Sequence, residues 1–247
     1  MRYKIQVTVI SLCTAFAFTA CGKREAKPAS ENLQTPHLDT QVFAQVNIQS
    51  QTPEAASKAA VKSITKIVFL GDSLTAGYGL PREQAWPEQV QLRLKSAGYN
   101  TAIINAGVSG DNTANGLARY DWSVGETGAD VLVLALGAND FLQGVPPATT
   151  RKNLKAIIEQ AQADNLKVIL AGVATPQLER LGPIGKSYAT IYPELAKTYD
   201  LSFFPSILSG VSNRPELLQS DGLHPTKAGV EIMADRFTQY LRKDLDN

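Results

Sequence analysis

The feature that most constrains the fold is a regular alternation, between residues 64 and 247, of short apolar runs with longer amphipathic segments. The apolar runs predict five strands, and the segments between them predict helices. Strands that alternate with helices form a parallel sheet that is covered on both faces, so we expect a single α/β domain. The expected strands cover residues 66–70, 101–105, 130–136, 166–173 and 201–204, and the expected helices cover residues 83–96, 111–120, 146–163, 187–199 and 226–245.

The first twenty residues have the pattern of a secretion signal. Two basic residues precede an uncharged, mostly apolar run that is too short for a transmembrane helix, which needs about 20 apolar residues. The run ends in Phe18-Thr19-Ala20-Cys21, which resembles the lipobox of bacterial lipoproteins, where the chain is cut before a cysteine that carries lipid. We therefore expect a lipid anchor on Cys21; the alternative is an ordinary signal in which Cys21 is incidental.

Residues 21–63 are rich in Ala, Gln, Ser, Thr, Lys and Pro and predict a tether between the anchor and the domain at 64–247. Some apolar residues of this tether, such as Val42 and Phe43, are suited to docking on the domain. The expected location is the bacterial cell envelope, with the domain facing the periplasm. Gly22 after the cysteine is compatible with sorting to the outer rather than the inner membrane.

Composition excludes several classes of function. Removing the predicted signal takes away Arg2 and Lys4 and leaves a net charge of −1, so no basic excess points to nucleic acid. Cys21 is then the one remaining cysteine, and the domain has neither a thiol nucleophile nor cysteine ligands for zinc. No glycine-rich dinucleotide fingerprint follows a strand. We therefore expect no metal and no cofactor, and we expect a monomer.

Ser73 lies where a nucleophile is expected. The first apolar run, Ile67 to Leu70, leads directly into Gly71-Asp72-Ser73. In open parallel sheets, ligands bind beyond the carboxyl ends of the strands, and Ser73 is placed just past such an end. A serine hydroxyl is a poor nucleophile until a neighbouring base takes its proton, so the hypothesis requires a base elsewhere in the domain.

His224 is the one histidine of the domain and therefore the one candidate imidazole base. Asp221 precedes it by three residues, which puts the two side chains on one face of a turn or helix start. The carboxylate is then able to hold the imidazole tautomer and to stabilise the imidazolium. Alternatively, Asp221 caps the last helix and His224 is a surface residue. In combination with Gly71-Asp72-Ser73, we favour a Ser73-His224-Asp221 catalytic triad.

Three groups are suited to stabilising the oxyanion that forms when Ser73 attacks an ester or thioester. They are the backbone N–H groups of Ser73 and Gly110 and the side-chain amide of Asn139. The alternative for Gly110 and Asn139 is a purely structural role in turns. We expect Asp72 to make a structural hydrogen bond within its turn and Asp111 to cap a helix.

An acyl-binding groove is expected beside these groups. Leu80, Phe141 and Leu142 are apolar residues in loops that follow strands, and we expect them to line the groove together with the loop at 175–185.

The chain contains four short motifs, which are Gly71-Asp72-Ser73-Leu74, Gly110, Gly137-Ala138-Asn139-Asp140 and Asp221-Gly222-Leu223-His224-Pro225. In order and in approximate spacing, they resemble the four blocks of the SGNH (GDSL) hydrolases. The resemblance covers essentially all of residues 64–247. It implies a flavodoxin-like three-layer α/β/α fold with a five-stranded parallel sheet, a nucleophile at Ser73, and a base and an acid at His224 and Asp221. The same resemblance implies oxyanion donors at Ser73, Gly110 and Asn139.

Four further motifs are Ala85-Trp86-Pro87, Ser109-Gly110-Asp111, Gly116-Leu117-Ala118-Arg119 and Ile191-Tyr192-Pro193. They are similar to motifs of the bacterial periplasmic members of this family that are thioesterases, lysophospholipases and arylesterases. The sequence departs from close members at Ala138, where glycine is common, and in its predicted anchor and tether. We expect a serine esterase that acts on acyl esters, thioesters or lysophospholipids. The alternatives are a carbohydrate or peptidoglycan O-acetyl esterase and a non-enzymatic envelope-binding module.

Overall fold

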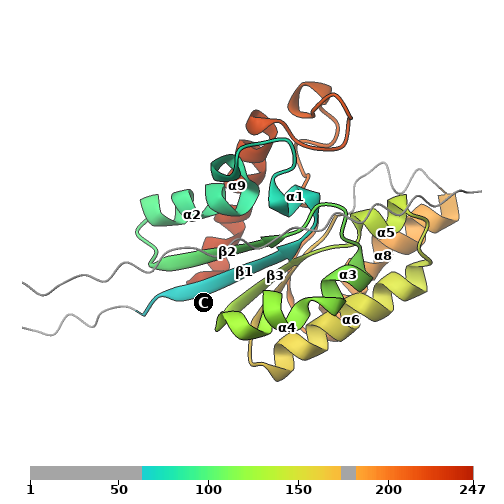
Figure 1. Ribbon diagram of the computed structural model, residues 1–247, viewed down its shortest axis with the longest axis horizontal. Coiled ribbons are helices and arrows are strands. Elements are labelled where there is room, and N and C mark those ends of the chain that lie inside the picture. Colours follow the sequence, from blue (N-terminus) through green and yellow to red (C-terminus); the bar gives the residue numbers. More distant parts are fainter. Residues whose placement is uncertain (1–62, 174–181, 247) are drawn as a thin grey trace, which may run out of the picture. The chain divides into compact units, whose positions relative to one another are not determined.

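A computed structural model describes residues 63–173 and 182–246. The predicted signal, the lipidation site Cys21 and the tether lie outside these residues. Five strands form one sheet in the order β2-β1-β3-β4-β5, and all four neighbouring pairs are parallel (Figure 1). The strands are β1 (Thr65–Gly71), β2 (Thr101–Gly107), β3 (Val131–Ala135), β4 (Lys167–Ala171) and β5 (Ser202–Phe204).

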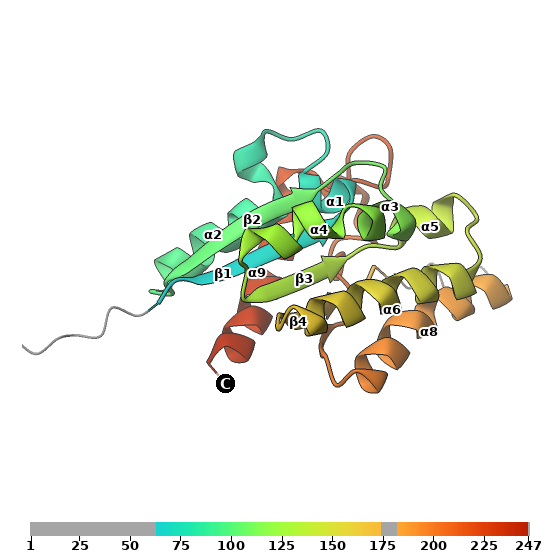
Figure 2. The same cartoon turned by 60° about the horizontal axis from the view of Figure 1, so that its bottom comes forward.

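Helices cover both faces of this sheet (Figures 1 and 2). One face carries α2 and α9, and the other carries α3, α4, α6 and α8. The three-layer α/β/α fold expected from the sequence is therefore confirmed. The helices are α1 (Ser73–Ala76), α2 (Trp86–Ser96), α3 (Thr113–Ala118), α4 (Tyr120–Ser123), α5 (Ala138–Leu142), α6 (Pro147–Ala163), α8 (Gly182–Thr198) and α9 (Lys227–Leu245), with 3-10 turns at Arg82–Gln84, Gly125–Thr127 and Pro215–Leu217.

The core explains why the strands are apolar on both sides. Every residue of β3 is buried, as expected for the middle of a parallel sheet between two helical layers. Between the sheet and the α2/α9 layer, aromatic rings meet edge to face, with Phe69–Trp86 centroids 5.1 Å apart and Trp86–Phe237 centroids 5.0 Å apart. Phe204 from β5 joins this cluster against Phe237 at 5.2 Å. Such edge-to-face pairs stabilise a core beyond the area that they bury.

Element boundaries differ from the sequence-based expectation in three places. The helix expected at 187–199 begins earlier, at Gly182, and the one expected at 111–120 is split into α3 and α4. A short helix, α5, occupies residues 138–142, although residues 141–146 were expected to form a loop. Helices of four to six residues are too short to show a helical period, so the pattern does not reveal them.

The carboxyl ends of β1, β2 and β3 come together at one edge of the sheet, because parallel strands share their direction. Gly71 at the end of β1 pairs with Gly107 of β2 and with Ala135 of β3. The loops that follow these three strands therefore face one another. Within the described part of the chain, no helix combines the length and the hydropathy needed to cross a membrane.

Candidate active site

Ser73 is the first residue of α1, directly beyond the end of β1. Asp72 caps this helix, and its Oδ1 atom accepts a hydrogen bond of 3.0 Å from the Leu74 N–H. The structural hydrogen bond predicted for Asp72 is thus present. The first N–H groups of a helix have no acceptor within the helix, so the Ser73 N–H needs an acceptor from outside it, such as a ligand.

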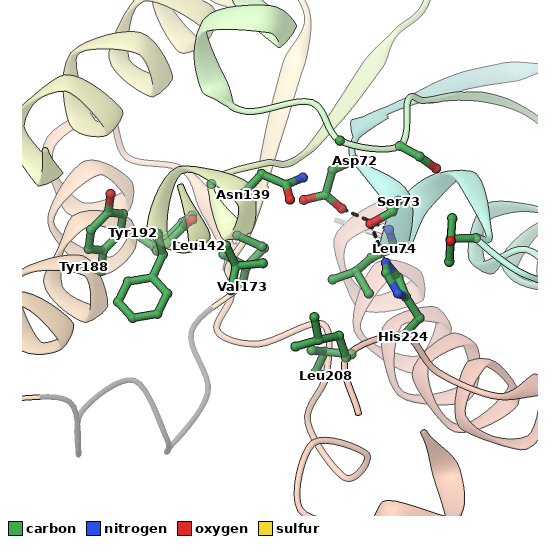
Figure 3. Close-up of a pocket in the computed structure, with 17 residues that line it drawn as sticks. Asp72, Ser73, Leu74, Asn139, Leu142, Val173, Tyr188, Tyr192, Leu208 and His224 are labelled. Carbon is green, nitrogen blue, oxygen red and sulfur yellow. Dashed lines mark hydrogen bonds between the residues drawn. The ribbon is translucent and has the colours of Figure 1, made fainter. Parts of the chain in front are cut away.

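His224 reaches Ser73 from the far end of the chain. Its Nε2 atom lies 2.8 Å from Ser73 Oγ (Figure 3). Its Nδ1 atom lies 2.6 Å from Asp221 Oδ2. The other carboxylate oxygen of Asp221 accepts hydrogen bonds from the backbone N–H groups of Leu223 and His224, at 2.9 and 3.0 Å. The structure therefore brings together the three residues that the sequence proposed, in the geometry of a nucleophile, a base and an orienting acid.

Asp221 is held in its ionised form. The hydrogen bond from the His224 side chain, followed by those from the His224 and Leu223 backbone, lowers its pKa to about 2. A carboxylate that stays charged keeps the Nδ1 proton on the imidazole and leaves Nε2 free to accept the proton of Ser73.

Tyr78 and Gln219 hold the His224 loop against the Ser73 loop. The Tyr78 ring packs on the imidazole with centroids 4.4 Å apart and an angle of 36° between the planes. The Gln219 side-chain amide donates to the carbonyl groups of Tyr78 and Pro225, at 2.8 and 2.9 Å, and the Gln219 backbone N–H donates to the His224 carbonyl. Neither residue was singled out from the sequence, because their contacts join segments about 140 residues apart.

The predicted oxyanion donors line one cavity with Ser73. Gly110 has a φ of +88°, which favours glycine and turns the loop after β2 toward Ser73. The Asn139 side-chain amide donates one hydrogen bond of 2.9 Å to the Asp111 carbonyl. An amide nitrogen has two N–H groups, so this bond holds the amide in place and leaves the second N–H for a ligand.

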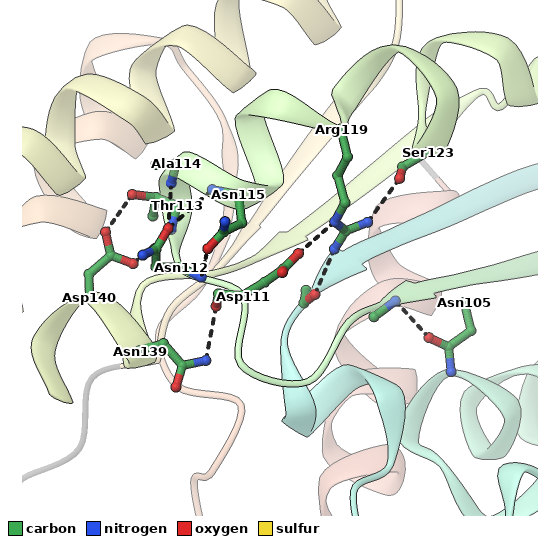
Figure 4. A network of polar contacts seen from close by, with 12 residues as sticks. Asn105, Asp111, Asn112, Thr113, Ala114, Asn115, Arg119, Ser123, Asn139 and Asp140 are labelled. Atoms are coloured by element: carbon green, nitrogen blue, oxygen red, sulfur yellow. Dashed lines mark hydrogen bonds and ion pairs between the residues drawn. The ribbon is translucent and has the colours of Figure 1, made fainter. Parts of the chain in front are cut away.

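Arg119 connects the loops that carry these donors (Figure 4). Its side chain is largely buried and donates to Asp111 Oδ2 at 2.6 Å, to the Gly71 carbonyl at 2.9 Å and to Ser123 Oγ at 2.9 Å. The expectation that Asp111 caps a helix is wrong: Asn112 caps α3, and the Asp111 carboxylate pairs with Arg119. The Arg119 guanidinium thus holds both Asp111, which follows Gly110, and the Gly71 carbonyl, which lies two residues before Ser73.

Asp72 is the buried carboxylate of the site. Burial raises its pKa to about 6, although the hydrogen bond from Leu74 and the neighbouring His224 act in the opposite direction. Its Oδ2 atom is buried and has no hydrogen-bond partner in the structure. A carboxyl group in such surroundings favours the neutral form up to nearly neutral pH.

A cavity of about 390 Å³ opens beside Ser73 and is lined mainly by apolar and aromatic side chains. Phe141 and Leu142 line it, as predicted, and Figure 3 shows Leu142 and Tyr188 on the Asn139 side of Ser73. The expectation for Leu80 is wrong, because this residue packs on the hydrophobic core and does not line the cavity. The remaining apolar lining comes from Leu74, Tyr78, Ala138, Val173, Tyr192, Leu208 and Leu223. The loop predicted to join this lining falls mostly on residues 174–181, outside the described residues.

Tyr188 forms the wall of this cavity behind Phe141. The two rings meet at 85° with centroids 5.2 Å apart, and the Tyr188 hydroxyl donates to the Val145 carbonyl. Tyr188 was not selected from the sequence, since the helix that contains it was expected to begin only one residue earlier, at residue 187. Among residues 63–173 and 182–246, no group of three or more His, Cys, Asp or Glu side chains is arranged to hold a metal ion.

Comparison with known protein families gives a match that covers most of the described residues. Residues 69–232 match the GDSL-like Lipase/Acylhydrolase family. This range starts within β1 and ends within α9, so it includes Ser73, Gly110, Asn139, Asp221 and His224.

Characterised relatives and solved structures are similar over most of their length. An arylesterase of Vibrio mimicus is 35% identical over 191 residues, which cover 76% of this chain and 93% of the relative. The thioesterase 1/protease 1/lysophospholipase L1 of Escherichia coli K12 is 31% identical over 177 residues, 71% of this chain and 83% of the relative. The crystal structure of the psychrotrophic esterase EstA from Pseudoalteromonas sp., inhibited by monoethylphosphonate, superposes with a TM-score of 0.69 at 27% identity, over 74% of this chain and all of that one.

Proposed function

Because this chain belongs to the GDSL-like Lipase/Acylhydrolase family and is a serine ester hydrolase, we propose that Ser73 is its nucleophile, His224 its general base and Asp221 the orienting acid. The observation that carries this assignment is the continuous chain of contacts from Ser73 Oγ through the imidazole to the Asp221 carboxylate, with distances of 2.8 and 2.6 Å. Membership of a hydrolase family with esterase relatives argues against the alternative of a non-enzymatic envelope-binding module.

The mechanism follows from these contacts. His224 Nε2 takes the Ser73 proton as Oγ attacks the acyl carbon, and Asp221 stabilises the imidazolium that results. The negative charge on the carbonyl oxygen is accepted by the N–H groups of Ser73, Gly110 and Asn139. His224 then gives its proton to the leaving oxygen or sulfur. Water activated by the same imidazole hydrolyses the acyl-enzyme and restores Ser73.

We propose acyl esters and thioesters, including lysophospholipids, as the substrate class. The support is the apolar cavity beside Ser73, since aromatic and aliphatic walls such as Phe141, Leu142 and Tyr188 suit a hydrocarbon chain. Its volume of about 390 Å³ is larger than an acetyl group requires. The O-acetyl esterase alternative would be better served by a shallow polar cleft with aromatic platforms.

The decisive experiment is hydrolysis of a p-nitrophenyl ester series from acetate to palmitate by the wild type and by Ser73→Ala. We expect a preference for medium or long chains that disappears in the variant, together with phosphonate labelling confined to Ser73. Activity restricted to acetate would favour the O-acetyl esterase. Labelling of another residue would refute the assignment of the nucleophile.

The oxyanion assignment has its own test, Asn139→Ala. Loss of one oxyanion donor typically lowers kcat by about 10²- to 10³-fold with little change in KM, because the interaction forms in the transition state. Asn153→Ala is the matched control, since that amide donates to Thr113 Oγ1 rather than lining the cavity. Equal kinetic effects of the two substitutions would contradict the role of Asn139.

We propose, from the sequence of residues 1–63, that the protein is exported and anchored in the outer membrane by lipid on Cys21, with Gly22 as the support for the outer membrane. We also propose that the domain faces the periplasm and is a monomer. Incorporation of labelled palmitate that is abolished by Cys21→Ala tests the anchor. Light scattering of the purified protein tests the monomer.

A further inference from the structure

The position of the leaving group is defined by the atom that must protonate it. His224 Nε2 lies 2.8 Å from Ser73 Oγ, so it reaches both the attacking oxygen and the oxygen that departs from the same acyl carbon. Proton transfer requires the leaving oxygen to approach Nε2 to about 3 Å. The alcohol part of the substrate therefore extends from Ser73 over the side chains that surround His224.

Two apolar side chains surround His224 and are half exposed. Tyr78 packs on the imidazole at 4.4 Å and is 52% exposed, and Leu223 precedes His224 and is 50% exposed. Both line the cavity. Figure 3 shows Leu142 and Tyr188 on the Asn139 side of the cavity, away from His224. We therefore assign that side to the acyl chain and the surroundings of His224 to the leaving group.

The Tyr78 ring is held in place before any substrate binds. The Gln219 amide fixes the Tyr78 carbonyl at 2.8 Å, and the imidazole supports one side of the ring. A fixed aromatic surface binds another ring with little loss of conformational freedom, in an offset or edge-to-face arrangement. An aliphatic leaving group would gain only the nonspecific burial of apolar area there.

We propose that Tyr78 binds the leaving group and makes the enzyme selective for esters of aromatic alcohols and phenols over aliphatic esters with the same acyl chain. This rests on the proposed triad and substrate class. In the step concerned, the bond between Ser73 Oγ and the acyl carbon forms and the bond from that carbon to the alcohol oxygen breaks. The proton of Ser73 passes through His224 to the departing alcohol.

A purely supporting role of Tyr78 makes a different prediction. If the ring only holds the imidazole, its removal disturbs proton transfer to every leaving group by the same factor. If the ring binds the leaving group, the loss is larger for aromatic leaving groups. The ratio of kcat/KM between two esters with one acyl chain separates these roles, because effects on the acyl side and on His224 cancel in it.

The test compares benzyl butanoate with cyclohexylmethyl butanoate, whose leaving groups are both primary alcohols of similar size. In the full chain, Tyr78→Leu should lower the benzyl to cyclohexylmethyl ratio of kcat/KM by about 3- to 10-fold, the range expected for one aromatic pair. Tyr78→Phe should retain the ratio. Leu142→Ala, on the acyl side, should alter kcat/KM for both esters by one common factor.

Each outcome decides the inference. An equal loss for both esters in Tyr78→Leu would show that Tyr78 only supports His224 and would overturn it. A ratio that drops equally in Tyr78→Phe would do the same, because the aromatic ring would not be responsible. If the wild type hydrolysed neither ester while keeping its fold by circular dichroism, the proposed substrate class would fail first.

Discussion

Asp72 is a buried carboxyl group, and its charge makes stability depend on pH. Its pKa in the folded protein is about 6, above its ordinary value of 3.8, so the folded state binds more protons than the unfolded state between these pH values. The free energy of unfolding therefore falls as pH rises through this window. The full contribution is on the order of 3 kcal/mol, from about 1.4 kcal/mol for each pH unit.

The substitution Asp72→Asn tests this directly. The asparagine Oδ1 atom is able to accept the Leu74 hydrogen bond, and the buried charge is removed. We expect the variant to gain stability relative to the wild type as pH rises from 4 to 7, measured by urea unfolding at each pH. A difference that stays constant over this range would show that Asp72 is not the titrating group.

At Gly137, backbone conformation and packing both require glycine. Its φ is +118°, and an added Cβ would lie 2.2 Å from the Tyr192 hydroxyl oxygen. That hydroxyl donates to the Leu136 carbonyl at 2.8 Å and so holds the junction between β3 and α5. Gly137→Ala should lower the free energy of unfolding by about 1–3 kcal/mol through backbone strain, and further through the clash.

Gly144→Ala is the matched control for Gly137→Ala. Gly144 also has a positive φ, +70°, but an added Cβ would meet no atom within 4 Å. Urea unfolding should show the smaller loss for this control. Adding Tyr192→Phe to Gly137→Ala should recover part of the loss, since the hydroxyl oxygen is removed. No recovery would mean that backbone strain alone accounts for the effect.

At the scale of elements, Arg119 ties the end of β1 to the loop before α3 and to α4. A lysine at this position keeps the charge but not the planar set of donors that reaches three acceptors at once. Arg119→Lys should therefore misplace the oxyanion donors and lower kcat more than it changes KM. We expect a loss of about 10- to 100-fold, smaller than the effect of removing one donor outright.

Arg93→Lys is the control for Arg119→Lys. Arg93 pairs with Asp235 on the face formed by α2 and α9, away from the cavity. Steady-state kinetics of both variants on one p-nitrophenyl ester make the comparison. If the two substitutions had the same small effect, the Arg119 network would not be needed to position the donors.

The elements were predicted where their length allowed a pattern to appear. All five strands and the long helices α6 and α9 were recognised, because runs such as 131–136 are apolar on both faces and the helices span several turns. The short helices α1 and α5 were not recognised, and α3 and α4 were expected as one helix. Asn112 rather than Asp111 is the cap of α3, since the buried Arg119 claims the Asp111 carboxylate through a contact eight residues away in sequence.

At the scale of the whole molecule, the segment from Ser57 to Asn247 contains all the residues of the site. A fragment that begins at Ser57 should therefore hydrolyse soluble p-nitrophenyl esters with the kcat/KM of the full chain. In cells, the full chain should sediment with membranes and Cys21→Ala should not, because buried acyl chains provide about 0.8 kcal/mol for each CH₂ group.

Cell fractionation followed by the ester assay measures both properties. Equal membrane content of the full chain and of Cys21→Ala would contradict the lipid anchor. A fragment with much lower kcat/KM than the full chain would mean that residues before Ser57 contribute to the site.

The sequence by itself determined the fold class, the family and the grouping of His224 and Asp221 with Ser73. Buried strands and chemically specialised motifs leave local signals, since a parallel sheet collects the loops after its strands at one edge. Only the tertiary structure decided the role of Asp111, the exclusion of Leu80 from the cavity and the placement of Tyr78 on His224. These depend on side chains that meet across distant segments, and no local pattern encodes which partner a buried charge or a half-exposed ring will find.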